Sequence, residues 1–237
     1  MSKIIVMYKT NFTLGLLIVS VIALSLHSTA WADDINPGIF STDSQPYGLT
    51  YEDWGKKWWQ WFISLPEDQN PLNDETGEKC QNGQVDPNVW YLTGTGGGTV
   101  TRSCTLPNGT SVLISVAGNS CAYSEYPNLS SEKELRDCAI AGNQVDRLEV
   151  FVDGRKLEDV RNYHATSDLF TEDFPENNLW DVKPGPTEAV YDSYLLFLEP
   201  LSIGNHTIRF LQNTVLGDVG NYAYDVTYLL NVEEPVG

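Results

Sequence analysis

The apolar residues between Thr50 and Pro66 recur with the period of an α-helix, in the sequence T-Y-E-D-W-G-K-K-W-W-Q-W-F-I-S-L-P. Thr50 is a favourable N-cap, and Asp53 in the first turn completes a variant of the capping box. Pro66 disfavours the helical conformation at the residue before it and therefore ends the helix. The pattern predicts an amphipathic helix over residues 50–66.

Tryptophan dominates the apolar side of this helix, which covers an arc of about 200°, roughly twice the minimum for a helix resting on a core. The centre of the arc holds Tyr51, Trp58, Phe62 and Leu65, and its flanks hold Trp54, Trp61, Trp59 and Ile63. A flat sheet would cover only part of such an arc, so we expect the helix to lie in a groove, under a loop or against a partner. Trp59 and Trp61 lie on opposite flanks, where both core packing and an exposed platform for a sugar or a partner stay open.

Strand-like alternation of apolar and polar residues replaces the helical period in the second half of the chain. Strands are predicted over residues 88–93, 99–105, 110–116, 147–152, 191–198, 205–212 and 222–232. The strand over 110–116 carries apolar residues on both faces, as in the centre of a buried sheet. The Asn-Gly pair at 108–109 predicts a tight hairpin, and Asp-Gly at 153–154 predicts another.

Helical signals are few beyond the Trp-rich segment. Residues 118–143 form an excursion from the strand pattern that holds a short helix over residues 131–139, with a serine as its N-cap. Short strands separated by turn signals are typical of an all-β sandwich. We therefore predict an all-β fold, an Ig-like or jelly-roll sandwich, that carries the Trp-rich helix and the short helix.

An apolar run over residues 12–26 follows the positively charged Lys3 and Lys9 and ends near an A-W-A tripeptide at Ala32. These features predict a secretory signal peptide cut after Ala32. An uncleaved anchor is the alternative, because the uncharged stretch is nearly long enough to span a bilayer. With cleavage, residues 33–237 would form a single exported domain, periplasmic or extracellular and free of the membrane.

The four cysteines all follow the predicted cleavage site, at Cys80, Cys104, Cys121 and Cys138. An even number in an exported protein indicates disulfide bonds. Three pairings are possible, and we favour neighbours in sequence, Cys80 with Cys104 and Cys121 with Cys138. Each bond would close a loop of about 20 residues and contribute on the order of 3 kcal/mol. The absence of C-x-x-C and the small number of histidines disfavour a metal site at the cysteines.

The chain carries a formal net charge of −18, and removal of two lysines with the signal peptide would leave −20. Such a charge repels phosphate backbones, so nucleic acid is not expected as a partner. The segment from Glu67 to Cys80 is rich in oxygen ligands that could suit calcium, although its spacing differs from an EF-hand loop. These ligands are Asp68, Asn70, Asn73, Asp74, Glu75 and Glu78. No other cofactor is indicated.

A second group of candidate residues lies between Ser167 and Thr187, which we predict to be a long loop. It holds Glu172, Asp173, Glu176 and Trp180. Paired carboxylates beside a tryptophan are what a glycoside hydrolase needs, so an enzyme acting on polysaccharide is one alternative. The histidines have no nucleophile or acid beside them in a recognisable motif, and no catalytic residue is expected from them.

Several motifs together resemble a known group of sequences. They are W-x-x-x-W-W-x-W at 54–61, D-x-T-G-x-x-C at 74–80, V-W-Y-L-x-G at 89–94, E-P-L-x-x-G-x-H-T-I-R-F at 199–210 and D-V-T-Y-x-L-x-V at 225–232. The set is similar to a family of small exported bacterial β-rich proteins of unassigned function. The resemblance implies export and a compact β-rich fold, and it brings no catalytic residues.

The leading hypothesis is a non-catalytic exported β-sandwich protein that binds a carbohydrate, a surface polymer or a protein partner. The candidate contact residues are Trp59, Trp61, Trp180, Glu172 and Asp173. A further alternative is a structural component of an envelope assembly, in which the Trp-rich helix would dock on another subunit.

Overall fold

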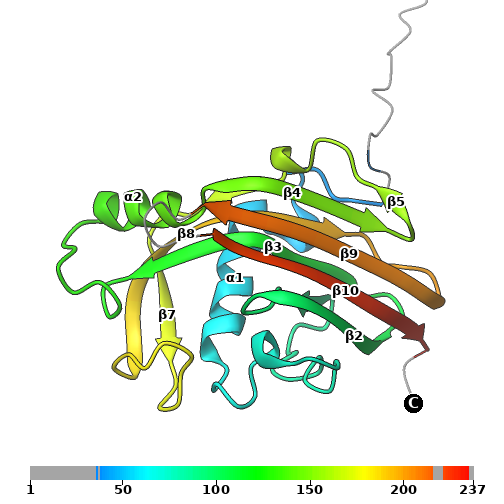
Figure 1. Cartoon of the computed structure of the whole chain (residues 1–237), viewed down its shortest axis with the longest axis horizontal. Helices are drawn as coiled ribbons and strands as arrows, with labels where there is room; N and C mark the ends of the chain where they lie inside the picture. The colour runs from blue at the N-terminus through cyan, green and yellow to red at the C-terminus, as the bar shows by residue number, and fades with distance from the viewer. Residues whose placement is uncertain (1–35, 37, 216–220, 235–237) are drawn as a thin grey trace, which may run out of the picture. The chain divides into compact units, whose positions relative to one another are not determined.

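The computed structural model describes residue 36, residues 38–215 and residues 221–234, so the predicted signal peptide lies outside the described part. This part of the chain is mostly β, with two five-stranded sheets and two α-helices (Figure 1). None of its helices is long and apolar enough to cross a membrane.

The first sheet holds β1 (Val89–Leu92), β3 (Ser111–Ala122), β8 (Gly185–Leu198), β6 (His164–Thr166) and β7 (Phe170–Phe174). The second sheet holds β2 (Gly98–Pro107), β10 (Asn221–Glu233), β9 (Gly204–Val215), β4 (Val145–Val152) and β5 (Arg155–Lys156). The α-helices are α1 (Tyr51–Ser64) and α2 (Glu132–Gly142), and three short 3-10 helices span Pro46–Gly48, Pro71–Asn73 and Val160–Asn162. Most strand pairs are antiparallel, but β1 pairs with β3 and β2 with β10 in parallel.

The first sheet is buried on both faces. Val112 and Ile114 of β3 pack into a hydrophobic cluster with Phe210 of the second sheet. Leu113, between them in sequence, packs instead into a cluster with the tryptophans of α1. Since successive side chains of a strand point to opposite faces, β3 separates the second sheet from α1. The prediction of a central strand apolar on both faces is confirmed.

Helix α1 begins as the sequence predicts, because the Thr50 hydroxyl accepts a hydrogen bond from the Asp53 amide at 3.1 Å. The helix runs across the first sheet (Figure 1), and all four of its tryptophans are buried. Their indole N–H groups donate to Pro46 O, Leu92 O, Ser193 Oγ and Asn82 O. Both flanks of the broad apolar arc are therefore covered within the chain.

Gly55 sets the distance between α1 and the first sheet. A Cβ at this position would lie 2.0 Å from the Tyr191 hydroxyl and 2.8 Å from Leu195 Cδ1. The Tyr191 ring cannot easily move away, since it is fully buried and its hydroxyl donates to Glu52 O at 2.8 Å. The glycine thus allows the close approach that buries the tryptophans.

Gly55→Ala should lower the free energy of unfolding by about 1–3 kcal/mol, because overpacking outweighs the roughly 1 kcal/mol that alanine gains in a helix. Gly96→Ala is the matched control, since nothing lies within 4 Å of its Cβ position. We expect the control to change stability by less than about 0.5 kcal/mol. Urea denaturation of both variants measures the difference, and a stabilised Gly55→Ala protein would contradict the packing described.

Two predictions from local sequence are wrong. The Asn-Gly turn at 108–109 does not form a hairpin, because it connects β2 of the second sheet to β3 of the first. The segment between Ser167 and Thr187 is not a long loop, because it contains β7 and the start of β8. In β7 the buried Phe170, Glu172 and Phe174 alternate with exposed residues. Because the middle buried residue is an acid, the sequence does not show the apolar alternation that is typical of a strand. The Asp-Gly hairpin at 153–154 is confirmed by the pairing of β4 with β5.

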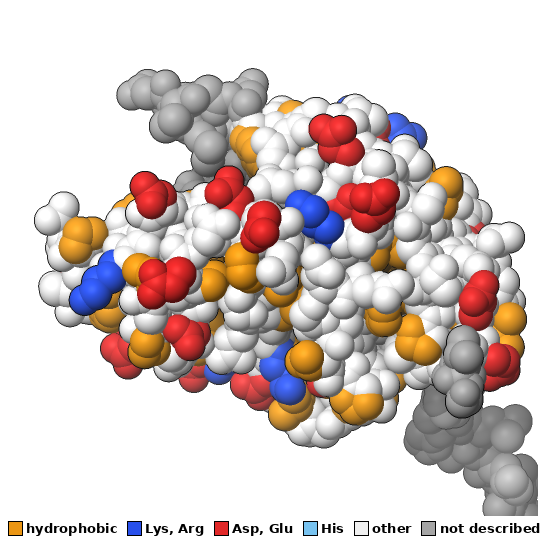
Figure 2. All heavy atoms as spheres, turned by 90° about the horizontal axis from the view of Figure 1, so that it is seen from below, with side chains coloured by type: hydrophobic (Ala, Val, Ile, Leu, Met, Phe, Trp, Pro, Cys, Tyr) orange, Lys and Arg blue, Asp and Glu red, His pale blue; other side chains and the backbone are white. Residues whose placement is uncertain are grey.

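The disulfide bonds join Cys80 to Cys104 and Cys121 to Cys138, the pairing that the sequence favours. The first bond attaches the segment after α1 to β2. The second attaches α2 to β3, so the excursion is stapled as predicted. Carboxylates are scattered over the face shown in Figure 2 with few Lys or Arg side chains among them, in keeping with a dispersed, solvated negative charge.

Candidate functional site

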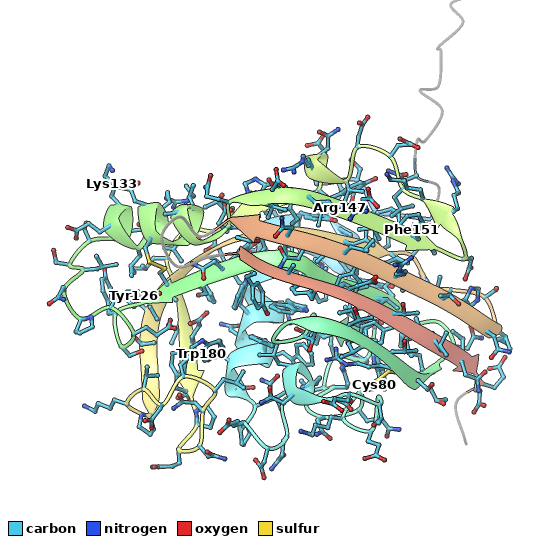
Figure 3. All side chains as sticks on the ribbon, viewed as in Figure 1. Cys80, Tyr126, Lys133, Arg147, Phe151 and Trp180 are labelled. Carbon is cyan, nitrogen blue, oxygen red and sulfur yellow. A yellow bond between two sulfur atoms is a disulfide. The ribbon has the colours of Figure 1, made fainter. Side chains whose placement is uncertain are left out.

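A cavity of about 640 Å³ opens between α1, β3 and α2, and we call it the aromatic pocket. Its aromatic lining consists of Trp58, Trp59, Phe62, Tyr126, Trp180, Tyr222 and Tyr224. Its polar lining includes Thr93, Thr95, Ser115, Asn119, Ser120, Glu125, Gln212 and Thr214. Tyr126 and Trp180 are 42% and 40% exposed, and they lie toward the end of the molecule that carries α2 and β7 (Figure 3). The pocket therefore combines ring faces with hydrogen-bonding groups and is open to solvent.

The inner wall of the aromatic pocket is rigid. Trp58 stacks on Phe62 with ring centroids 5.0 Å apart, and Trp59 packs edge-to-face on Trp58 at 5.1 Å. The indole N–H groups of both tryptophans bond to groups of the first sheet, at 2.8 Å to Leu92 O and 3.0 Å to Ser193 Oγ. With their polar atoms engaged, these side chains can offer a ligand only ring surface.

Trp180 forms the outer wall from the turn between β7 and β8. The Asn178 side chain shapes this turn, since its oxygen accepts from the amides of Trp180 and Val182 and its nitrogen donates to Pro175 O. The Trp180 ring contacts Phe62 edge-to-face at 5.9 Å. Its indole N–H makes no hydrogen bond within the described residues, so the side chain presents both a ring face and a donor.

Two carboxyl groups lie on the β3 side of the aromatic pocket. Glu125 lines it, and burial raises the pKa of Glu125 to about 7, against a lowering by the Ala122 amide that donates to it. Glu172 lies behind Ser120, whose hydroxyl donates to Glu172 Oε1 at 2.7 Å. Burial raises the pKa of Glu172 to about 8; Ser120 opposes this and the nearby Glu125 adds to it. Glu172 Oε2 is buried and finds no hydrogen-bond partner in the part of the chain that the structure describes.

The raised pKa of Glu172 predicts a loss of stability as the pH rises from about 4.5 to about 8. In this window the folded chain holds a proton that the unfolded chain has released, so unfolding becomes more favourable as the pH rises. Asp74 and Asp192 have lowered pKa values and therefore act only at more acidic pH.

Glu172→Gln removes the titrating carboxyl and with it this loss of stability at higher pH. The free energy of unfolding of the variant, relative to that of the native protein, should therefore rise between about pH 5 and about pH 8. Thermal unfolding at the two pH values measures the change. A difference in melting temperature that is the same at both would contradict the buried, protonated acid.

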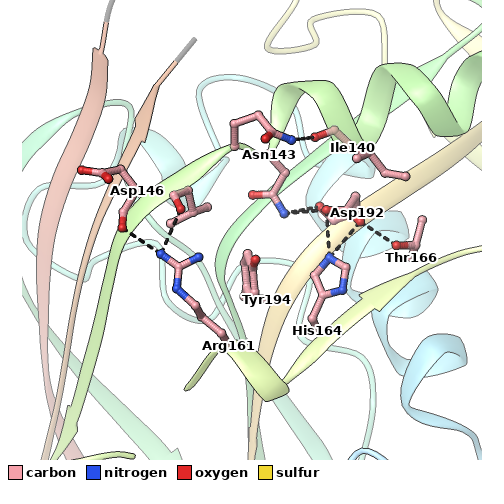
Figure 4. A pocket seen from close by; sticks show the side chains of 10 residues that line it. Ile140, Asn143, Asp146, Arg161, His164, Thr166, Asp192 and Tyr194 are labelled. Atoms are coloured by element: carbon pink, nitrogen blue, oxygen red, sulfur yellow. Dashed lines mark hydrogen bonds and ion pairs between the residues drawn. The ribbon is translucent and has the colours of Figure 1, made fainter. Parts of the chain in front are cut away.

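A second cavity, of about 520 Å³, lies between the end of α2, β4, β6 and β8 (Figure 4). At its centre the buried Asp192 accepts hydrogen bonds from His164 Nε2, Thr166 Oγ1 and Asn143 Nδ2. Burial tends to raise the pKa of Asp192, but these donors outweigh it and hold the pKa below its usual range. Arg161 donates to the Val145 and Asp146 carbonyls.

The side chains that line this second cavity connect several elements of the fold. The Thr166 hydroxyl, which lines the cavity with His164, donates its proton to Asp192. Asn143 follows α2 while Asp192 lies in β8, so their bond fixes the end of the helix on the first sheet. Because the Thr166 hydroxyl donates to Asp192 and not to the imidazole, these two described residues do not form the nucleophile–base contact of a hydrolytic triad.

The predicted contact residues separate in the structure. Trp59 and Trp180 line the aromatic pocket, and Glu172 supports it from behind. Trp61 lies away from the pocket, 5% exposed, with its ring against Tyr91. Asp173 points to solvent from β7.

Sequence reasoning missed Glu125, Tyr126 and the two tyrosines of β10 that line the aromatic pocket, Tyr222 and Tyr224. Glu125 and Tyr126 lie in the stapled excursion, which the spacing of the cysteines did single out as a long segment on a β scaffold. The period-2 pattern of β10 correctly placed both tyrosines on one face, but no local signal shows that this face meets α1 and α2 around a cavity.

The segment proposed for calcium is organised by its own side chains. Asp74 accepts from the amides of Thr76, Gly77 and Lys79, and Asn70 bonds to Leu72 N and Phe62 O. Among the described residues, no group of three or more His, Cys, Asp or Glu side chains is placed to hold a metal ion.

No protein-family model and no curated protein matches this chain.

Proposed function

We propose that this protein is an exported β-sandwich that binds a carbohydrate, free or within a surface polymer, in the aromatic pocket. The observation that carries the proposal is the pairing of a partly exposed Trp180 with the buried ring wall of Trp58 and Trp59 across one cavity. Sugars present apolar C–H faces and a rim of hydroxyls, and this cavity offers rings for the faces and polar groups for the hydroxyls.

Several polar groups of the pocket are fixed before any ligand arrives. Gln212 accepts from Thr214 Oγ1 at 2.6 Å and donates to the Tyr222 carbonyl, and Tyr224 donates to Val116 O at 2.9 Å. Such preorganised groups reduce the entropy lost on binding. The two disulfide bonds support the export part of the proposal, because such bonds persist in oxidising compartments.

The positions of the acidic residues fit carbohydrate binding better than they fit glycoside hydrolysis. Glycoside hydrolysis needs two carboxyl groups that flank the scissile bond. Glu125 is the one carboxyl residue in the described lining of the aromatic pocket, while Glu172 lies behind Ser120 and Asp173 is exposed on β7. The proposed docking of the Trp-rich helix on an envelope subunit loses its basis, because Trp59 and Trp61 are each 5% exposed.

Isothermal titration with a panel of neutral oligosaccharides from cell walls tests the proposal. We expect at least one to bind, and Trp180→Ala should weaken that binding about 10-fold or more, as expected for loss of an aromatic anchor. Leu229→Ala is the control, since Leu229 is exposed on β10 and does not line the pocket. Absence of binding by every glycan, or full affinity in Trp180→Ala, would overturn the proposal.

A further inference from the structure

The aromatic pocket has a carboxyl group in its described lining and no basic side chain beside it. Its described lining contains no Lys, Arg or His side chain, and Glu125 is its one ionisable carboxyl. Most carboxyl groups buried in proteins have a cationic or multiple hydrogen-bonding partner. Among the residues that the structure describes, the Glu125 carboxyl has a single hydrogen-bond donor, the Ala122 amide at 3.2 Å.

A second carboxyl group lies close to Glu125. Glu172 is fully buried behind Ser120, and its Oε2 atom has no hydrogen-bond partner among the described residues. A positive charge brought into the cavity would favour the ionised form of the Glu125 carboxyl. The surrounding tryptophan and tyrosine faces attract a cation as well, because the negative part of the ring quadrupole faces outward from the ring plane.

We propose, building on the proposed carbohydrate binding, that the preferred ligand is an amino sugar whose protonated amino group lies against Glu125. The sugar ring would pack between Trp180 and the wall of Trp58 and Trp59. The ammonium would then pair with the Glu125 carboxylate, which lines the cavity. The alternative is that Glu125 and Glu172 both stay protonated and the pocket binds only neutral glycans.

A matched pair of probes separates these cases, namely the trimer of glucosamine and the trimer of N-acetylglucosamine. The two trimers share the sugar ring and the linkage. The first carries an amine at the position where the second carries an amide. We expect the native protein to bind the amine trimer roughly 10- to 100-fold more tightly, the range for a charge-assisted bond in a partly buried site. In Glu125→Gln the preference should fall to about twofold or less, while the N-acetyl trimer keeps its affinity and so shows that the variant folds.

Proton linkage gives an independent readout. At a pH below the raised pKa of Glu125, binding an ammonium drives ionisation of the acid, so about one proton should be released to the buffer. Titration in two buffers of different ionisation enthalpy counts that proton. The native protein should release it with the amine trimer only, and Glu125→Gln should release none. Asp173→Asn, which neutralises an exposed acid of β7, should behave as the native protein does.

Failure of the ammonium proposal can be distinguished from failure of the proposed function. Equal affinity for both trimers, or an amine preference that survives Glu125→Gln, would overturn the ammonium proposal and leave carbohydrate binding standing. Binding of neither trimer nor any other glycan would overturn the proposed function as well.

Discussion

Replacing Arg102 by methionine should lower the free energy of unfolding by about 3–5 kcal/mol, the range for stripping one member from a buried charged network. Arg102 lies in β2 with no exposed surface. Its guanidinium donates to the carbonyls of Leu72, Asp74, Thr93 and Gly94 and to the hydroxyl of Tyr228. One side chain thus joins the segment after α1, the end of β1 and the second sheet.

Methionine fills a similar volume but donates nothing, so several buried carbonyl oxygens would lose their partner. Arg209→Met is the matched control, because Arg209 forms an exposed pair with Asp225 on neighbouring strands of the same sheet. Exposed pairs contribute about 0–1 kcal/mol. Guanidinium chloride unfolding compares the two variants, and equal losses would contradict the role given to Arg102.

Removing the disulfide bond between Cys121 and Cys138 should lower the free energy of unfolding by about 3 kcal/mol, as loop-closure entropy predicts for a separation of 17 residues. The double variant Cys121→Ala, Cys138→Ala should also weaken glycan binding, because Cys138 and Gly142 of α2 line the aromatic pocket. Unfolding and titration measure the two effects on one preparation.

The other disulfide bond provides the control. Cys80→Ala, Cys104→Ala removes a bond that closes 24 residues, so its cost in stability should be similar. Neither cysteine lines the aromatic pocket. Glycan affinity should therefore be kept in this variant and weakened in the first. If both double variants bind equally well, α2 does not position the pocket.

Local signals were enough for the features that depend on neighbouring residues. The cap at Thr50, the end of α1 and the Asp-Gly hairpin each follow from side chains within a few positions. The disulfide pairing followed because each bond joins cysteines close in sequence. The buried central strand could be read from apolar residues on both of its faces.

Features that depend on distant partners could not be read in this way. The turn at 108–109 carries a hairpin signal, but its amide at Asn108 bonds to Glu233, because β2 pairs in parallel with β10 from the end of the chain. Glu172 looked like a loop acid and is a buried residue of a strand. No local pattern marked Glu125 as a site residue, because Glu125 lines the aromatic pocket only where residues 118–143 meet α1 and β10.

The most direct test of the aromatic pocket is fluorine NMR of protein labelled with fluorotryptophan, recorded while a bound glycan is titrated. Trp58, Trp59 and Trp180 line the pocket, so their resonances should shift together with one affinity. The resonances of Trp54, Trp61 and Trp90, which lie outside that lining, should stay in place. Shifts confined to this second group of tryptophans would contradict the account.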